Sequence, residues 1–318
     1  MTSTAEPIRA PLATSRLAER IGLRYLCLCL VIPLIGYTFP FVAERVKPLK
    51  DLSVTYGGSI LDHGHHLAGE NADIILFGDS TIMFGVDTVR LSQELGLKVL
   101  NLPNTYGSLA NTGDWALREY LASNKPPRLI VFQTAPWNMD FNQVPNPAPY
   151  EGDEEIVRHA DWREFVRFTW AYPRQILLFP FRFYAVNTPL TSVTGDHRPH
   201  LASVTQGYTP NLLTATLHPG CVFAGIQEEE HGTGSVEHLL RAYRSPTTKT
   251  IAYLSPLPAC RNVDPIAGYH YPGFDIAPPV VIPPEYISAD FTHAHPTAKW
   301  VPYTTDLLAK VIRKALEP

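Results

Sequence analysis

The sequence ADIILFGDST, residues 72–81, is an apolar run that ends abruptly in Gly-Asp-Ser. Ile74 to Phe77 have the β-branched and aromatic character of a buried parallel strand, and Gly78 allows a tight turn where that strand would feed a helix. A serine in such a turn lies at the carboxyl end of a strand, which is the edge of an open α/β sheet where ligands bind. Ser80 is therefore a candidate nucleophile, although Gly-Asp-Ser is also ordinary turn chemistry.

A candidate base lies near the C-terminus, in the segment ISADFTHAHP, residues 287–296. Asp290 and His293 are three residues apart, so that one loop can carry both an imidazole and the carboxylate that fixes its tautomer. His295 is a competing imidazole two residues further on. The Asp-x-x-His spacing favours His293, and we expect Ser80, His293 and Asp290 to form a catalytic triad.

The sequence around these residues alternates between strand and helix patterns. Apolar runs predict further strands, and apolar residues at helical spacing predict helices between them, which together indicate a parallel sheet covered on both faces. The predicted strands are residues 98–102, 128–133 and 248–255, and the predicted helices are residues 86–95, 112–121, 235–243 and 298–316.

Two further polar positions follow predicted strands. Gly107 comes after the second strand and Asn138 after the third, so both are expected at the same sheet edge as Ser80. A glycine N–H and a side-chain amide are donors that can stabilise an oxyanion. The alternatives are a plain turn glycine and a loop-capping asparagine.

Composition narrows the class of protein. The chain has 318 residues, 45% of them hydrophobic, which is enough for a packed core. Its formal net charge is −4, which gives no basic footprint for nucleic acid. The 30 prolines cluster in a few stretches and predict long loops added to the core.

The N-terminal region contains a candidate membrane anchor. Residues 25–43 form a stretch of nineteen residues without a charge, the length of a membrane span. We expect a tail over residues 1–24, a single transmembrane anchor over 25–43 and a linker over 44–71. A cleaved signal or a buried core helix is the alternative. The short tail favours an N-inside topology that places the main domain outside the cytoplasm.

The strand and helix rhythm is interrupted over about residues 141–240, which we interpret as an insertion. The segment from Asp161 to Tyr184 is dense in aromatic residues and arginine. It could form an amphipathic helix pair that acts as a lid, lies on the membrane surface or contacts a membrane partner. Alternatively, its aromatic residues are simply the core of a subdomain.

Cysteines and histidines give little indication of a metal. Outside the apolar N-terminal stretch the chain has only Cys221 and Cys260, which would be either one disulfide or two reduced thiols. His63, His65 and His66 invite a metal interpretation, but a solvated linker explains them as well. No metal and no cofactor is expected.

Ser80, Gly107, Asn138 and the Asp290-x-x-His293 pair stand in the order of the four conserved blocks of one superfamily, and together they resemble the SGNH (GDSL-type) hydrolases. The resemblance covers about residues 72–140 and 250–318 of a domain expected over 72–318. It implies a flavodoxin-like three-layer α/β/α sandwich. It also implies that Ser80 is the nucleophile, His293 the base and Asp290 its orienting residue. Ser80, Gly107 and Asn138 would form the oxyanion hole.

The resemblance together with the anchor predicts a membrane-tethered serine ester hydrolase that acts outside the cytoplasm, in the periplasm if the source is bacterial. Its substrates would be O-acyl esters, most simply O-acetyl esters, including those of glycans. The chain is also similar to the membrane-anchored members that acetylate envelope glycans or exopolysaccharides together with a membrane-bound O-acyltransferase, so an acetyltransferase is the second hypothesis. A non-catalytic envelope scaffold is the third.

Overall fold

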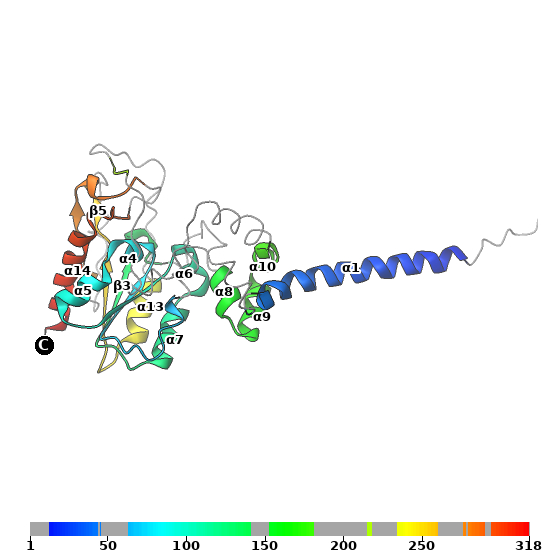
Figure 1. The fold of residues 1–318 in the computed structure, drawn as a ribbon, viewed down its shortest axis with the longest axis horizontal. Coiled ribbons are helices and arrows are strands. Elements are labelled where there is room, and N and C mark those ends of the chain that lie inside the picture. Colours follow the sequence, from blue (N-terminus) through cyan, green and yellow to red (C-terminus); the bar gives the residue numbers. More distant parts are fainter. Residues whose placement is uncertain are drawn as a thin grey trace, which may run out of the picture.

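The computed structural model describes residues 13–43, 45, 63–140, 153–180, 215–217, 234–259, 276–277, 279–289 and 294–317. Within this part of the chain the protein is an α/β protein built on a parallel sheet, from which a long N-terminal helix projects (Figure 1). The strand order is β2-β1-β3-β4-β6. These strands are β1 (Ile74–Gly78), β2 (Val99–Pro103), β3 (Leu129–Thr134), β4 (Lys249–Leu254) and the two-residue β6 (Ile276–Ala277).

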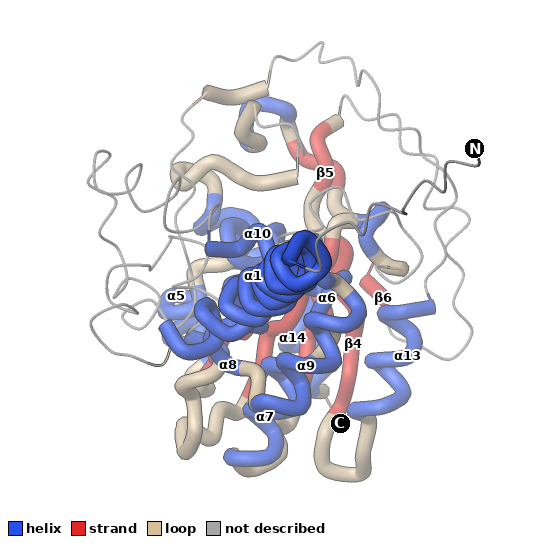
Figure 2. The backbone as a smooth tube through the Cα atoms, turned by 90° about the vertical axis from the view of Figure 1, so that its right-hand side faces the viewer, coloured by secondary structure: helices blue, strands red, loops and turns tan. Residues whose placement is uncertain are grey.

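Helices cover both faces of this sheet, because successive side chains of each strand point to opposite sides. Ile74 and Leu76 of β1 pack with α4, α5 and α14, whereas Ile75 and Phe77 pack with α6, α7 and α13. These helices are α4 (Ser80–Gly85), α5 (Thr88–Leu95), α6 (Tyr106–Thr112), α7 (Trp115–Ser123), α13 (Gly234–Tyr243) and α14 (Val301–Leu316). Figure 2 shows α13 and α14 separated by strand β4.

The predicted strands and most predicted helices are therefore confirmed. The helix expected over residues 112–121 begins instead at Trp115, because Gly113 adopts a positive φ of 62° that ends α6. The helix expected over 86–95 is preceded by the short α4, which follows β1 directly. Strand β6 was not predicted, since two residues carry no periodic pattern.

Gly78 ends β1 at a point where the backbones of β1 and β3 lie in close contact. A Cβ atom at this position would lie 1.7 Å from the carbonyl oxygen of Gln133 on β3. Only glycine fits this close approach of two backbones. The contact fixes the turn that carries Asp79 and Ser80.

The described part of the insertion forms three helices beside the C-terminal end of α1. They are α8 (Asp153–His159), α9 (Trp162–Ala171) and α10 (Pro173–Pro180), and they share a hydrophobic cluster centred on Phe165, Phe168 and Ile176. Tyr37 and Phe41 of α1 (Ala13–Ala43) pack against this cluster. Residues 153–180 of the insertion thus form a small subdomain on the N-terminal helix. Cys221 and Cys260 lie outside the described residues.

Helix α1 contains one stretch long and apolar enough to cross a membrane, Arg20–Phe39, and the side chains of this stretch are not buried in the protein. The helix starts at Ala13, well before the uncharged stretch predicted over residues 25–43. Length and composition thus give one candidate span near the N-terminus.

The remaining short elements are two strands and two 3₁₀ turns, of which only η1 (Pro136–Asn138) does not lie in the C-terminal part of the chain. Strands β5 (Leu257–Pro258) and β7 (Val281–Ile282) pair in parallel, and the second 3₁₀ turn is η4 (Pro284–Tyr286). Of these elements, η4 directly precedes Ile287, which pairs with Pro296 in an antiparallel bridge.

Candidate active site

Ser80 and His295 face each other at the carboxyl edge of the sheet. Ser80 Oγ lies 2.8 Å from His295 Nε2, a hydrogen-bond distance. The serine hydroxyl donates to this nitrogen when the ring carries its own proton on Nδ1. The Phe84 ring meets the imidazole edge to face, with 4.9 Å between ring centroids. The arrangement places a hydroxyl within hydrogen-bond reach of an imidazole, as a nucleophile and its base would be.

The histidine that the structure places at Ser80 is therefore His295, the competing imidazole of the sequence, whereas His293 as the base stays a prediction. Ser288 N donates to His295 O at 2.8 Å, and Ile287 forms an antiparallel bridge with Pro296, so His295 is held where the two ends of this loop meet. The Asp-x-x-His spacing in the sequence carries no information about these backbone contacts of His295. His293 and Asp290 both lie outside the described residues.

Asp79, which the sequence analysis did not single out, organises the turn before Ser80. Its side chain is fully buried and caps α4 by accepting hydrogen bonds from Thr81 N (2.9 Å) and Thr81 Oγ1 (2.6 Å). Its second oxygen accepts from Ala135 N at 3.0 Å and from Asn138 Nδ2 at 2.7 Å. One carboxylate therefore ties the end of β1 to the end of β3.

Replacing Asp79 by asparagine is expected to lower the free energy of unfolding by about 2–3 kcal/mol, because an amide nitrogen would face donors that now meet a carboxylate oxygen. Urea unfolding of the purified protein measures this change. Asp87→Asn is the matched control, since Asp87 also caps a helix, α5, through Arg90 N at the exposed surface. Equal effects of the two substitutions would contradict the role given to Asp79.

The other expected site residues lie at the same edge. Gly107 is buried in the first turn of α6, directly after β2, and Asn138 is buried in η1, directly after β3. The Asn138 amide donates one hydrogen bond to Asp79. Tyr106, beside Gly107, has a pKa raised to about 12 by burial and by the negative charges of Asp140 and Asp79. The strand ends thus bring Ser80, Gly107 and Asn138 to one edge, as predicted.

A small pocket lies behind the pair. It is lined by Thr81, by Ala294 and Pro296 on either side of His295, and by Gln133, Tyr253 and Ser255 from the sheet side, with the remaining lining from Gly85, Val86, Pro256, Ile287 and Thr304. Burial raises the pKa of Tyr253, so its phenol stays neutral. Ser80 and His295 are not part of this lining, so we do not assign the pocket to the substrate.

A second polar cluster, which no sequence pattern predicted, lies where α6, α7 and α8 meet. His65 is buried between two carboxylates: Nδ1 donates to Glu119 and Nε2 donates to Glu155 at 2.8 Å. Since carboxylates only accept, both ring nitrogens must carry protons. Burial alone would lower the pKa of His65, but hydrogen bonds to Glu119 and Glu155 outweigh it and raise the pKa to about 9. The expectation of a solvated linker is wrong for His65.

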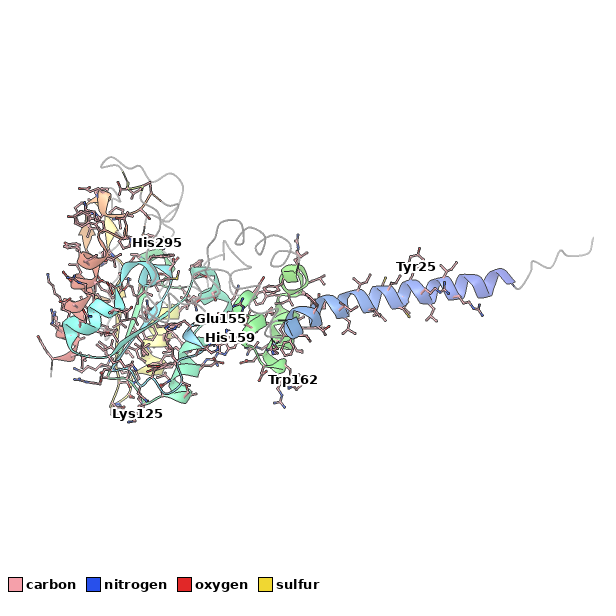
Figure 3. The ribbon with its side chains drawn as sticks, viewed as in Figure 1. Tyr25, Lys125, Glu155, His159, Trp162 and His295 are labelled. Carbon is pink, nitrogen blue, oxygen red and sulfur yellow. The ribbon has the colours of Figure 1, made fainter. Side chains whose placement is uncertain are left out.

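Glu155 links this cluster to the candidate site. It is fully buried in α8 and accepts hydrogen bonds from Ser108 Oγ (2.6 Å) and Thr112 Oγ1 (3.0 Å) of α6, the helix that carries Gly107. The His159 ring stacks on His65, with 4.1 Å between centroids. Figure 3 shows Glu155 and His159 between the sheet and the base of α1, apart from His295. The cluster therefore fastens the insertion to the sheet domain.

Within the described ranges, no group of three or more His, Cys, Asp or Glu side chains is placed to hold a metal ion. Comparison of the chain with protein-family models, with curated proteins and with solved structures finds no match. The chemistry of the site therefore has to be argued from its residues.

Proposed function

We propose that the protein is a serine ester hydrolase of the SGNH type, with Ser80 as nucleophile and His295 as general base. The observation that carries the proposal is the 2.8 Å contact between Ser80 Oγ and His295 Nε2. It joins two residues 215 positions apart at the sheet edge where α/β proteins bind ligands. A nucleophile within hydrogen-bond reach of an imidazole is the signature of acyl transfer through a covalent intermediate.

The sheet supports the same proposal. Its order, β2-β1-β3-β4-β6, corresponds to the flavodoxin-like order of doubly wound sheets, and helices lie on both faces. Ser80, Gly107 and Asn138 follow the first three strands of the chain. These are the positions that the SGNH resemblance implies for nucleophile and oxyanion donors.

The chemical steps follow from these positions. Ser80 Oγ attacks the acyl carbonyl carbon while its proton passes to His295 Nε2, and the carbonyl oxygen becomes an oxyanion. The N–H groups of Ser80 and Gly107 and the second amide hydrogen of Asn138 are the donors that we assign to it. Collapse breaks the ester bond, and His295 returns the proton to the leaving alcohol. Asp290 stays the predicted residue that orients the imidazole.

The acyl-enzyme is common to hydrolysis and transfer. Water would release a free acid, whereas a sugar hydroxyl would receive the acyl group, and the choice depends on which acceptor is bound and how well water is excluded. We propose hydrolysis of O-acyl esters, most simply O-acetyl esters, as the main activity. A glycan acetyltransferase that works with a membrane-bound partner is the variant with the same intermediate.

The candidate span in α1 supports a membrane location. We propose a single-pass anchor with the sheet domain outside the cytoplasm. An enzyme reporter that is active only outside the cytoplasm, fused after Pro318, tests the orientation. A fusion that is produced in full and sits in the membrane but has an inactive reporter would contradict it.

The test of the activity uses the full-length protein, purified in detergent, with a chromogenic acetate ester. We expect release of the chromophore and an acetyl adduct on Ser80 by mass spectrometry, both absent from Ser80→Ala. Ser92→Ala is the control, since Ser92 lies on α5 away from the pair. An adduct that turns over only when a glycan is added would identify the transferase. A folded protein that never becomes acylated would be a scaffold, and the proposal would fail.

A further inference from the structure

Helix α9 has two unlike faces. Phe165 and Phe168 are buried in the subdomain, whereas the side chains of Trp162, Val166 and Trp170 are exposed. These three residues are spaced four apart, so they form one row along the helix. Trp162 is 63% exposed and Trp170 is 89% exposed. Two such tryptophans in one row are unusual on a surface that contacts only water.

Helix α10, which packs on α1, also has exposed apolar side chains. Leu177 and Leu178 are exposed, and Leu177 also contacts α1, where a Cβ on Gly36 would lie 2.6 Å from Leu177 Cδ1. Gly36 lies three residues inside the candidate span Arg20–Phe39, which is about 4.5 Å of helix rise from its end. If α1 spans a membrane over this stretch, α10 lies at the boundary between hydrocarbon and headgroups.

The subdomain is held firmly in that place. The Phe41 ring of α1 packs on Phe165 of α9, with 4.9 Å between centroids. Arg45, just after α1, lies over the Phe41 ring and donates hydrogen bonds to Val157 O (2.9 Å) and to Ala160 O. Figure 1 shows α9 and α10 at the base of α1, and Figure 3 shows Trp162 there, at the outer side of the subdomain.

The charges beside this surface are mainly basic. Arg163, Arg167 and Arg174 are exposed on α9 and α10. The acidic residues are Asp161 and Glu164, which are engaged in the capping box that starts α9. Arginine beside an apolar row with tryptophan is the composition of helices that lie in a membrane interface, where the cations meet anionic lipid headgroups.

We propose that Trp162, Val166, Trp170, Leu177 and Leu178 form a lipid-contacting surface that inserts into the interface of the bilayer that α1 spans. The lipid surface is the occupant, because the surface continues directly from the end of the candidate span. The inference rests on the proposed anchoring by α1 and is independent of the proposed chemistry at Ser80. It makes α8 to α10 a base that fixes the tilt of the sheet domain above the membrane.

The test measures tryptophan fluorescence of the full-length protein in phosphatidylcholine and phosphatidylglycerol vesicles, with and without lipid brominated near the headgroup. The emission that differs between the wild type and the Trp162→Phe/Trp170→Phe variant belongs to the two surface tryptophans, and we expect brominated lipid to quench most of it. Trp115→Phe is the matched control. Trp115 is 4% exposed, inside the protein, so the emission that this variant loses should be unquenched.

Unquenched emission from Trp162 and Trp170 would overturn the inference and would leave a protein partner as the occupant of this surface. Extraction of the vesicles at alkaline pH separates this result from a failure of the anchor. A protein that stays in the vesicles but shows no quenching lacks the lipid contact, whereas a protein that is released has no membrane span. Neither readout depends on esterase activity.

Discussion

Replacement of His295 by alanine is expected to lower the rate of acetate-ester hydrolysis by about 10²- to 10⁴-fold, the usual contribution of a general base. Without the imidazole, the proton of Ser80 has no acceptor at 2.8 Å, and the hydroxyl becomes a poor nucleophile at neutral pH. The loss should appear in kcat, because the ring acts on the reacting atoms. Steady-state kinetics of the full-length protein in detergent measures it.

His293→Ala is the matched control for this substitution. The two histidines are two residues apart in the same loop, but the structure places His295 against Ser80. We expect the His293 variant to keep its activity within about tenfold, well below the loss expected at His295. A large loss at His293 with little change at His295 would contradict the assignment and would restore the base that the Asp-x-x-His spacing favoured.

The two histidines illustrate which features of the site the sequence patterns can predict and which they cannot. The apolar runs before Ser80, Gly107 and Asn138 predict the strand ends, because burial on both faces leaves a continuous signature in each strand. The position of His295 depends on backbone contacts such as the hydrogen bond from Ser288 N to His295 O. Backbone contacts of that kind leave no pattern in the residue types, so the sequence prediction rested on the Asp-x-x-His spacing alone and favoured His293.

The role of Asp79 and the carboxylate partners of His65 were not predicted for a related reason. Asp79 is the middle residue of Gly-Asp-Ser, and its type suits any turn, so nothing in the sequence indicates that Asn138 donates to it. His65 pairs with Glu119 and Glu155, which are 54 and 90 positions away. One signal could have pointed to the pair: Glu155 is followed directly by Ile156 and Val157, whose burial places a carboxylate next to apolar packing. The fold alone decides that its partner is a histidine.

The paired carboxylates at His65 predict that the protein loses stability as pH rises through about 9. The pKa of His65 is raised from 6.5 to about 9 because hydrogen bonds to Glu119 and Glu155 outweigh its burial. A group whose pKa is raised on folding contributes fully below its unfolded value, so this stabilisation is complete below pH 6.5 and is lost as pH rises through about 9. The contribution is on the order of 3 kcal/mol. Urea unfolding between pH 6 and 10 measures it.

Three variants separate His65 from its neighbours. His65→Gln should lose stability by about 3–5 kcal/mol at pH 6.5, because the buried Glu155 and the half-buried Glu119 lose their cation, and should lack the decline toward pH 9. His159→Phe keeps a ring stacked on His65 and should retain the decline, which excludes His159 as its source. Glu155→Gln removes one of the two carboxylates, so the decline should shift to lower pH. A decline of equal size in wild type and His65→Gln would mean that another group titrates. In that case the positive charge of His65, between the sheet domain and the insertion, would not explain how α6 and its residue Gly107 are held in place.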